Sequence, residues 1–128
     1  FQASVKNWCV ECFGETTAND ATERIWRFLE EALELVQSLG GSLENTLKMV
    51  GYTFGREKGE PRQELGGVMI TLAALSAAND LDMFSEGIRE LIRIQQPAMI
   101  EKIRAKHASK PLRSPLPGDY PTPPGSEG

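Results

Sequence analysis

The sequence predicts an all-α protein, a bundle of four to five helices followed by a proline-rich C-terminal tail. Apolar residues recur at helical spacing through most of the first 110 residues, and glycine, proline and capping residues divide them into segments of helical length. No alternating pattern of useful length predicts a strand, and no internal repeat is present. We therefore expect one helical domain over residues 1–110 and an extended tail over residues 111–128.

The first helix is expected over residues 2–13, where it ends at Gly14, with a polar connection over residues 15–20. Trp8, Cys9 and Cys12 share one face of it. The two cysteines form a single CxxC, and the only histidine lies far along the chain, so a zinc site is not expected. No βαβ pattern supports a redox motif. We interpret both thiols as reduced core residues.

The second helix is expected over residues 21–39. Asp20 and Glu23 have the spacing of a capping box, and the pair Gly40 and Gly41 is a strong end signal. Its apolar face is formed by Ile25, Phe28, Leu29, Ala32, Leu35, Val36 and Leu39.

Two further helices are expected over residues 43–54, capped by Ser42, and over residues 61–79, with Pro61 as first residue. Leu43, Leu47 and Val50 are expected to point inward from the first of these. The second is apolar nearly all round after Glu64 and rich in small residues, so we expect it to be buried on most sides.

A final helical region is expected over residues 84–108, with a kink or restart at Pro97. Its inward residues are expected to be Ile88, Leu91, Ile92, Ile100 and Ile103. From Pro111 onward, prolines interleave with glycine, serine and threonine, which is typical of an extended or disordered segment.

Composition limits the classes of function. The net charge of −4 argues against a general nucleic-acid binder, because phosphate backbones need a basic surface. No apolar run approaches the roughly 20 residues of a membrane span, and no secretory leader is visible. We therefore expect a cytoplasmic protein that binds neither a nucleic-acid polymer nor a membrane.

The second helix carries the first candidate site. Glu31 and Glu34 lie one turn apart on a polar stripe that includes Arg27, while Glu30 lies further round the helix. Two such carboxylates at the margin of an apolar face can bind a hard cation between packed helices. The alternative is an ordinary solvated, glutamate-rich helix face.

Glu64 favours the cation. It lies in the first turn of an apolar helix, where the helix dipole favours a carboxylate, so capping alone is the alternative. Three carboxylates meeting at ~4 Å would each repel the next by ~4 kcal/mol at an effective dielectric near 20. A divalent cation is the simplest way to stabilise them.

Lys102 and Lys106, one turn apart on the last helix, are either a solvated helix end or ligands for phosphate oxygens.

The order of these motifs resembles the MazG-like all-α nucleotide pyrophosphohydrolases, whose signature is EExxE, a variable gap and ExxD. Here the signature appears as EEALE at residues 30–34 and ELGG at residues 64–67, and the resemblance covers about residues 20–107. It implies a homodimer or homotetramer that binds magnesium, or manganese in its place. It also implies hydrolysis of a nucleoside triphosphate to the monophosphate and pyrophosphate. The one departure is Gly67, which stands where the signature has its last aspartate.

The resemblance also implies roles for individual residues. Glu31, Glu34 and Glu64 would be metal ligands, with Glu30 orienting them or the attacking water. Lys102 and Lys106, together with Arg27, would bind phosphate oxygens. Trp8 and Phe13 are the preferred platforms for stacking a base, ahead of Trp26, although each of these rings also suits a hydrophobic core.

Two other functions stay open. Gly67 is compatible with a non-catalytic relative that binds a nucleotide as a sensor or sequestering protein. The PxxP at Pro121 to Pro124 is compatible with a helical interaction module that recruits a partner through its tail.

Overall fold

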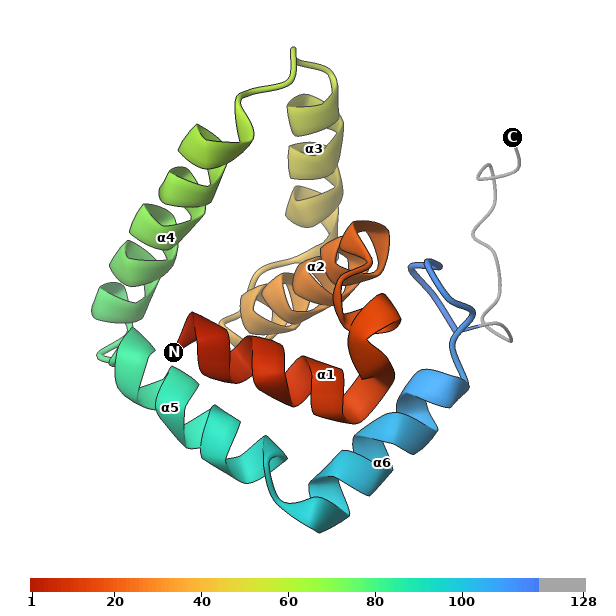
Figure 1. Ribbon diagram of the computed structural model, residues 1–128. Helices are drawn as coiled ribbons and strands as arrows, with labels where there is room; N and C mark the ends of the chain where they lie inside the picture. The colour runs from red at the N-terminus through yellow and green to blue at the C-terminus, as the bar shows by residue number, and fades with distance from the viewer. Residues whose placement is uncertain (118–128) are drawn as a thin grey trace. The chain divides into compact units, whose positions relative to one another are not determined.

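The computed structural model describes residues 1–117 and contains six helices over that range (Figure 1). They are α1 (Gln2–Ala18), α2 (Ala21–Ser38), α3 (Leu43–Phe54), α4 (Pro61–Ala78), α5 (Met83–Ile94) and α6 (Pro97–Ala108). The absence of strands from the described range confirms the all-α class. The predicted count of four to five helices was too low, because the chain restarts at Pro97 and separates α5 from α6. The predicted PxxP lies outside the described residues.

Local end signals position the helices as predicted. The Ser42 side chain accepts a hydrogen bond of 3.1 Å from the Asn45 amide and caps α3. Pro61 occupies the first turn of α4. Gly40 has a φ of 91° at the end of α2, and the Gly41 amide donates to the Val36 carbonyl at 2.9 Å. This left-handed ending is the one that glycine favours.

The end of α1 differs from the prediction. Gly14 breaks the regular helix with φ 80° and ψ 163°, but helical structure resumes after it and continues to Ala18. Residues 15–18 were predicted to be a polar connection. Their polarity was misleading, because glycine allows a kink and one further turn, closed by the Asn19 amide on the Glu15 carbonyl at 3.1 Å.

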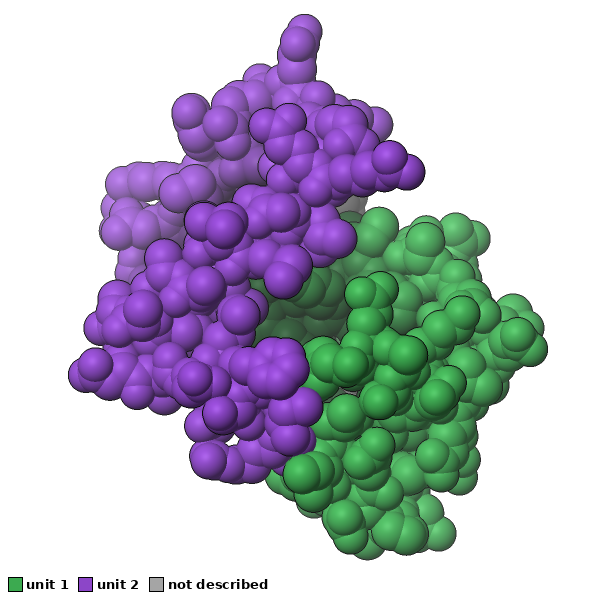
Figure 2. Space-filling view, turned by 60° about the vertical axis from the view of Figure 1, so that its left-hand side comes forward, with its two compact units in different colours: residues 1–33, 91–128 green, residues 34–90 purple. Residues whose placement is uncertain are grey.

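The chain divides into two compact units, residues 1–33 with 91–128 and residues 34–90 (Figure 2). In the described part of the first unit, α1 packs against α6. Its buried apolar residues are Cys12, Leu91 and Ile100. The Arg104 guanidinium also joins these two helices, because its Nε donates to the Cys12 carbonyl at 3.1 Å.

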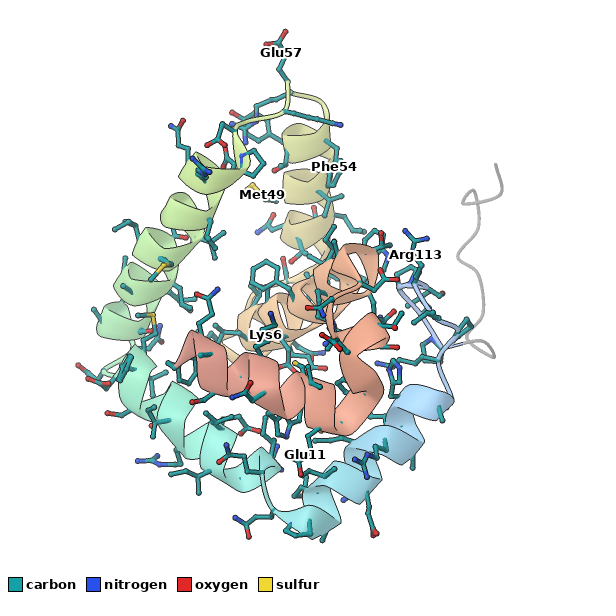
Figure 3. The ribbon with its side chains drawn as sticks, in the orientation of Figure 1. Lys6, Glu11, Met49, Phe54, Glu57 and Arg113 are labelled. Carbon is teal, nitrogen blue, oxygen red and sulfur yellow. The ribbon has the colours of Figure 1, made fainter. Side chains whose placement is uncertain are left out.

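The second unit exposes apolar side chains that were expected to be inward. Leu43, Leu47 and Val50 are all exposed, and none of residues 34–90 is buried. The expectation that α4 is buried on most sides is also wrong for this chain, since Ile70 is 72% exposed. Figure 3 labels Phe54 on α3, which is 86% exposed. Helical periodicity identifies the face that favours burial, and it does not identify what covers that face.

The first unit follows the same pattern at several predicted positions. The predicted inward residues Ile25, Phe28 and Ile92 are more than half exposed and Leu29 is 41% exposed, whereas Leu91 and Ile100 are buried. In the second unit the predicted inward residue Ile88 is also exposed. Within the described range no helix combines the length and apolarity that crossing a bilayer requires.

Candidate functional site

The acidic residues of α2 lie on one continuous helix. Because α2 is unbroken from Ala21 to Ser38, Glu31 and Glu34 are about 4.5 Å apart along its axis. Both residues are exposed. Glu30 is half-buried, and its two carboxylate oxygens each accept a 3.2 Å hydrogen bond from Lys110 Nζ. Lys110 therefore holds Glu30, while Glu31 and Glu34 lie on the exposed part of α2.

Glu64 lies in the first turn of α4, where the loop before the helix shapes its surroundings. Glu60 caps α4 by accepting a 3.0 Å hydrogen bond from the Gln63 amide. The Glu64 carboxylate folds back over Gly59, so closely that a side chain at position 59 would collide with it. This close approach of Glu64 to Gly59 was not predicted from the sequence. The position of Gly59 two residues before Pro61, at a helix start, is the signal that could have identified it.

Glu31 belongs to the first unit, whereas Glu34 and Glu64 belong to the second. No group of three or more His, Cys, Asp or Glu side chains that could hold a metal ion occurs among residues 1–117. The convergence of Glu31, Glu34 and Glu64 on one cation therefore stays a prediction.

Gly67 has open space around it. A Cβ built at this position meets no atom within 4 Å. No neighbouring side chain or backbone atom therefore requires a glycine here. An aspartate side chain would have room at the position where the related signature places one.

Asp82, which follows α4, has a structural role. It caps α5, because its Oδ1 accepts a 2.7 Å hydrogen bond from the Ser85 amide. Hydrogen bonds from the Ser85 backbone and hydroxyl lower the pKa of the Asp82 carboxyl. The contribution of this cap to stability is therefore complete above the ordinary pKa of an aspartate and is lost as the pH falls through the lowered value.

The predicted phosphate ligands of α6 lie on its exposed side. Lys102 and Lys106 are exposed, whereas Ile100 is buried and His107 is half-buried. Arg104, between the two lysines, is used to join α6 to α1. Lys102 and Lys106 are thus accessible to an anion, and their role as phosphate ligands stays a prediction.

The two preferred base-stacking rings form part of the packing in the first unit. The indole Nε1 of Trp8 donates a 2.8 Å hydrogen bond to the Ile94 carbonyl. Its ring meets Phe13 edge to face with centroids 5.9 Å apart, and Phe13 in turn lies 4.6 Å from the His107 ring. Base stacking on Trp8 or Phe13 would have to compete with these contacts, and it stays a prediction.

Both cysteines are free thiols in this packing, with Cys9 half-buried and Cys12 buried. Burial raises the pKa of the Cys12 thiol. A raised pKa keeps the thiol protonated, and the thiolate is the reactive form. These observations support the interpretation of the two cysteines as core residues.

Glu23 is the site residue that sequence reasoning missed. It is fully buried, its Oε2 accepts a 2.8 Å hydrogen bond from the Arg113 amide, and its Oε1 lies 3.7 Å from Arg27 Nε and 3.9 Å from His107 Nδ1. The capping box formed only in part. Asp20 accepts from the Glu23 amide at 3.1 Å as expected, but the Glu23 carboxylate is used by the segment after α6.

Arg27 takes part in the same cluster. Its Nη2 donates to the carbonyl oxygens of Ser114 at 3.0 Å and Pro115 at 3.1 Å. In this structure the predicted phosphate ligand therefore binds the protein's own backbone.

Comparisons of the chain with protein-family models, with curated proteins and with solved structures found no match. The functional proposal therefore depends on the ordered acidic motifs and on the placement of their residues.

Proposed function

We propose that the protein is a magnesium-dependent nucleotide pyrophosphohydrolase that cleaves a ribo- or deoxyribonucleoside triphosphate, or a related nucleotide, to the monophosphate and pyrophosphate. The carrying observation is the pair Glu31 and Glu34 on one exposed stretch of α2. Glu64 lies in the first turn of α4, and its carboxylate would add a third oxygen ligand of the kind that magnesium prefers.

Each residue has a role in this proposal. Glu31, Glu34 and Glu64 would hold the cation, which supplies neutralisation of the charge that develops on the phosphates. Glu30, held by Lys110, would orient these ligands or the water that attacks the α-phosphorus. Lys102 and Lys106 would bind phosphate oxygens from the exposed side of α6. A solvated helix face alone would give none of these residues a role in catalysis.

The proposed activity is tested with a panel of ribo- and deoxyribonucleoside triphosphates, assayed for pyrophosphate release. We expect release from at least one nucleotide in the presence of magnesium or manganese, and none when the metal is chelated. Absence of release from every member of the panel would contradict the proposal. Calorimetry with a non-hydrolysable triphosphate would then separate a nucleotide-binding relative, which binds it, from an interaction module, which does not.

We also propose that the protein works as a homodimer or homotetramer. The exposed apolar residues of α3 and α4 support this, because covering one Leu, Ile or Phe side chain contributes about 1.5–3 kcal/mol. A second copy of the chain presents the same faces and can cover them symmetrically.

Analytical ultracentrifugation at micromolar concentration checks the assembly. We expect a species with two or four times the 14.1 kDa mass of the chain. A dilution series provides the control, because a specific assembly dissociates into species of defined mass. A single species of 14.1 kDa at all micromolar concentrations would contradict the prediction.

A further inference from the structure

The segment after α6, residues 111–117, lies along α2 and is called the strap below. Arg113, labelled in Figure 3, is its main anchor. Its amide donates to buried Glu23 at 2.8 Å, its Nη2 donates to the Thr22 hydroxyl at 3.0 Å, and its Nε lies 3.5 Å from Asp20 Oδ2. These anchors of the strap are polar, and Leu112 beside Arg113 is 56% exposed.

The strap satisfies only part of the hydrogen-bonding capacity of the Arg27 guanidinium. Its Nε faces Glu23, and both strap carbonyls, those of Ser114 and Pro115, converge on Nη2. Arg27 Nη1 and Nε are both buried without a hydrogen-bond partner, and Nε has only the 3.7 Å ion pair with Glu23 Oε1. A guanidinium group binds a phosphate best when two oxygens meet two of its nitrogens. A phosphate group could therefore satisfy Nη1 and Nη2 together, which the backbone carbonyls do not.

The anchor of the strap is conformationally unfavourable. Arg113 has a φ of 66°, in the left-handed region that residues with a side chain rarely adopt. Such a conformation persists only when surrounding contacts enforce it. The contacts that enforce it here are those with Glu23, Thr22 and Asp20, so weakening them favours an open strap.

We propose that the strap is an autoinhibitory cover, and that Arg27 beneath it is a binding position for a phosphate group of the nucleotide. Opening of the strap frees Nη2, while the ion pair of Arg27 with Glu23, formed within α2, keeps the guanidinium in place. The identity of the ligand as a nucleotide rests on the proposed function. The competition between strap and phosphate for Arg27 depends only on this cluster.

Substitution of Arg113 in the full-length chain tests the cover. Arg113→Ala removes the side-chain anchors and keeps the unfavourable backbone conformation, so the strap should open more often. Arg113→Gly removes the same anchors but accepts a positive φ, so its strap should stay closed more often than that of the alanine variant. Loss of the positive charge of Arg113 would by itself weaken the binding of an anion. A gain in affinity therefore indicates that the strap has opened.

The probe is inorganic pyrophosphate, titrated by calorimetry with a chelator present and no metal. We expect Arg113→Ala to bind it about 10-fold more tightly than the unmodified chain, because apparent affinity rises with the fraction of the competent state. Arg113→Gly should lie between the two, and adding Arg27→Ala to Arg113→Ala should remove the gain. Equal affinities in all variants, or a gain that survives Arg27→Ala, would overturn the proposal.

Hydrogen exchange of the Arg113 amide in the unmodified chain gives a second readout that does not depend on the folding of a variant. We expect slow exchange without pyrophosphate and faster exchange at saturation, since binding releases the amide from Glu23. Unchanged exchange at saturation would overturn the proposal. Neither measurement uses metal or turnover, so its outcome is separate from that of the hydrolysis assay.

Discussion

Replacement of Glu31 by glutamine is expected to abolish magnesium-dependent turnover while the fold is retained. The change removes one charged ligand, and metal stabilisation of transition-state charge contributes several kcal/mol. A loss of 3–4 kcal/mol corresponds to about 100- to 1000-fold in rate. Because Glu31 is exposed, its replacement should cost far less in the free energy of unfolding than in rate. Steady-state pyrophosphate release and thermal unfolding measure the two effects.

Glu44→Gln is the matched control for this experiment. Glu44 is also an exposed helical glutamate, and it forms a 3.0 Å ion pair with Lys48 within α3. It has no role in the proposed site, so its removal should leave turnover unchanged. Undiminished turnover in a well-folded Glu31→Gln protein would exclude Glu31 as a metal ligand.

Replacement of Gly67 by aspartate is expected to strengthen magnesium binding in the absence of nucleotide. With only three carboxylates, waters and nucleotide phosphates would complete the octahedron of an ion that dehydrates reluctantly. Metal should then bind weakly to the unmodified protein alone and much more tightly with a non-hydrolysable triphosphate. Affinity for such cations depends on the number of charged ligands, so a fourth carboxylate should raise the nucleotide-free affinity by about 10-fold.

Gly66→Asp is the control for Gly67→Asp. A Cβ at either glycine meets no atom within 4 Å, so both substitutions should be tolerated by the fold. Only position 67 lies one turn after Glu64 on the same face of α4. Calorimetric titration of magnesium, with and without the triphosphate analogue, separates the two variants. Equal effects of both aspartates would show that added charge, and not a completed site, raises the affinity. A nucleotide-independent metal affinity in the unmodified protein would favour an inactive site.

The helices themselves could be predicted because their boundaries depend on local chemistry. Ser42, Pro61, Gly40 and Pro97 each act within a few residues of their own position, and each begins or ends a helix as expected. The end of α1 was missed because Gly14 can either end a helix or kink it, and local sequence does not distinguish these outcomes.

The environments of the candidate site residues could not be predicted in the same way. The hydrogen bond between Glu23 and Arg113 joins residues 90 positions apart, and no periodic pattern connects them. Arg27 lies on the polar stripe of α2 and Glu30 belongs to the EEALE motif, and their partners Ser114 and Lys110 are 87 and 80 positions away in sequence. Burial of α3 and α4 was also beyond prediction, because an apolar face does not specify the surface that covers it.

Hydrolysis in water labelled with heavy oxygen tests the central claim most directly. The unmodified protein is incubated with magnesium and the best nucleotide of the panel, and the products are identified by mass. Attack of water on the α-phosphorus predicts the monophosphate and pyrophosphate as the only products, with the label in the monophosphate. It also predicts that chelation of the metal stops the reaction. Release of single phosphates, label in the pyrophosphate, or no magnesium-dependent product from any nucleotide would contradict the account.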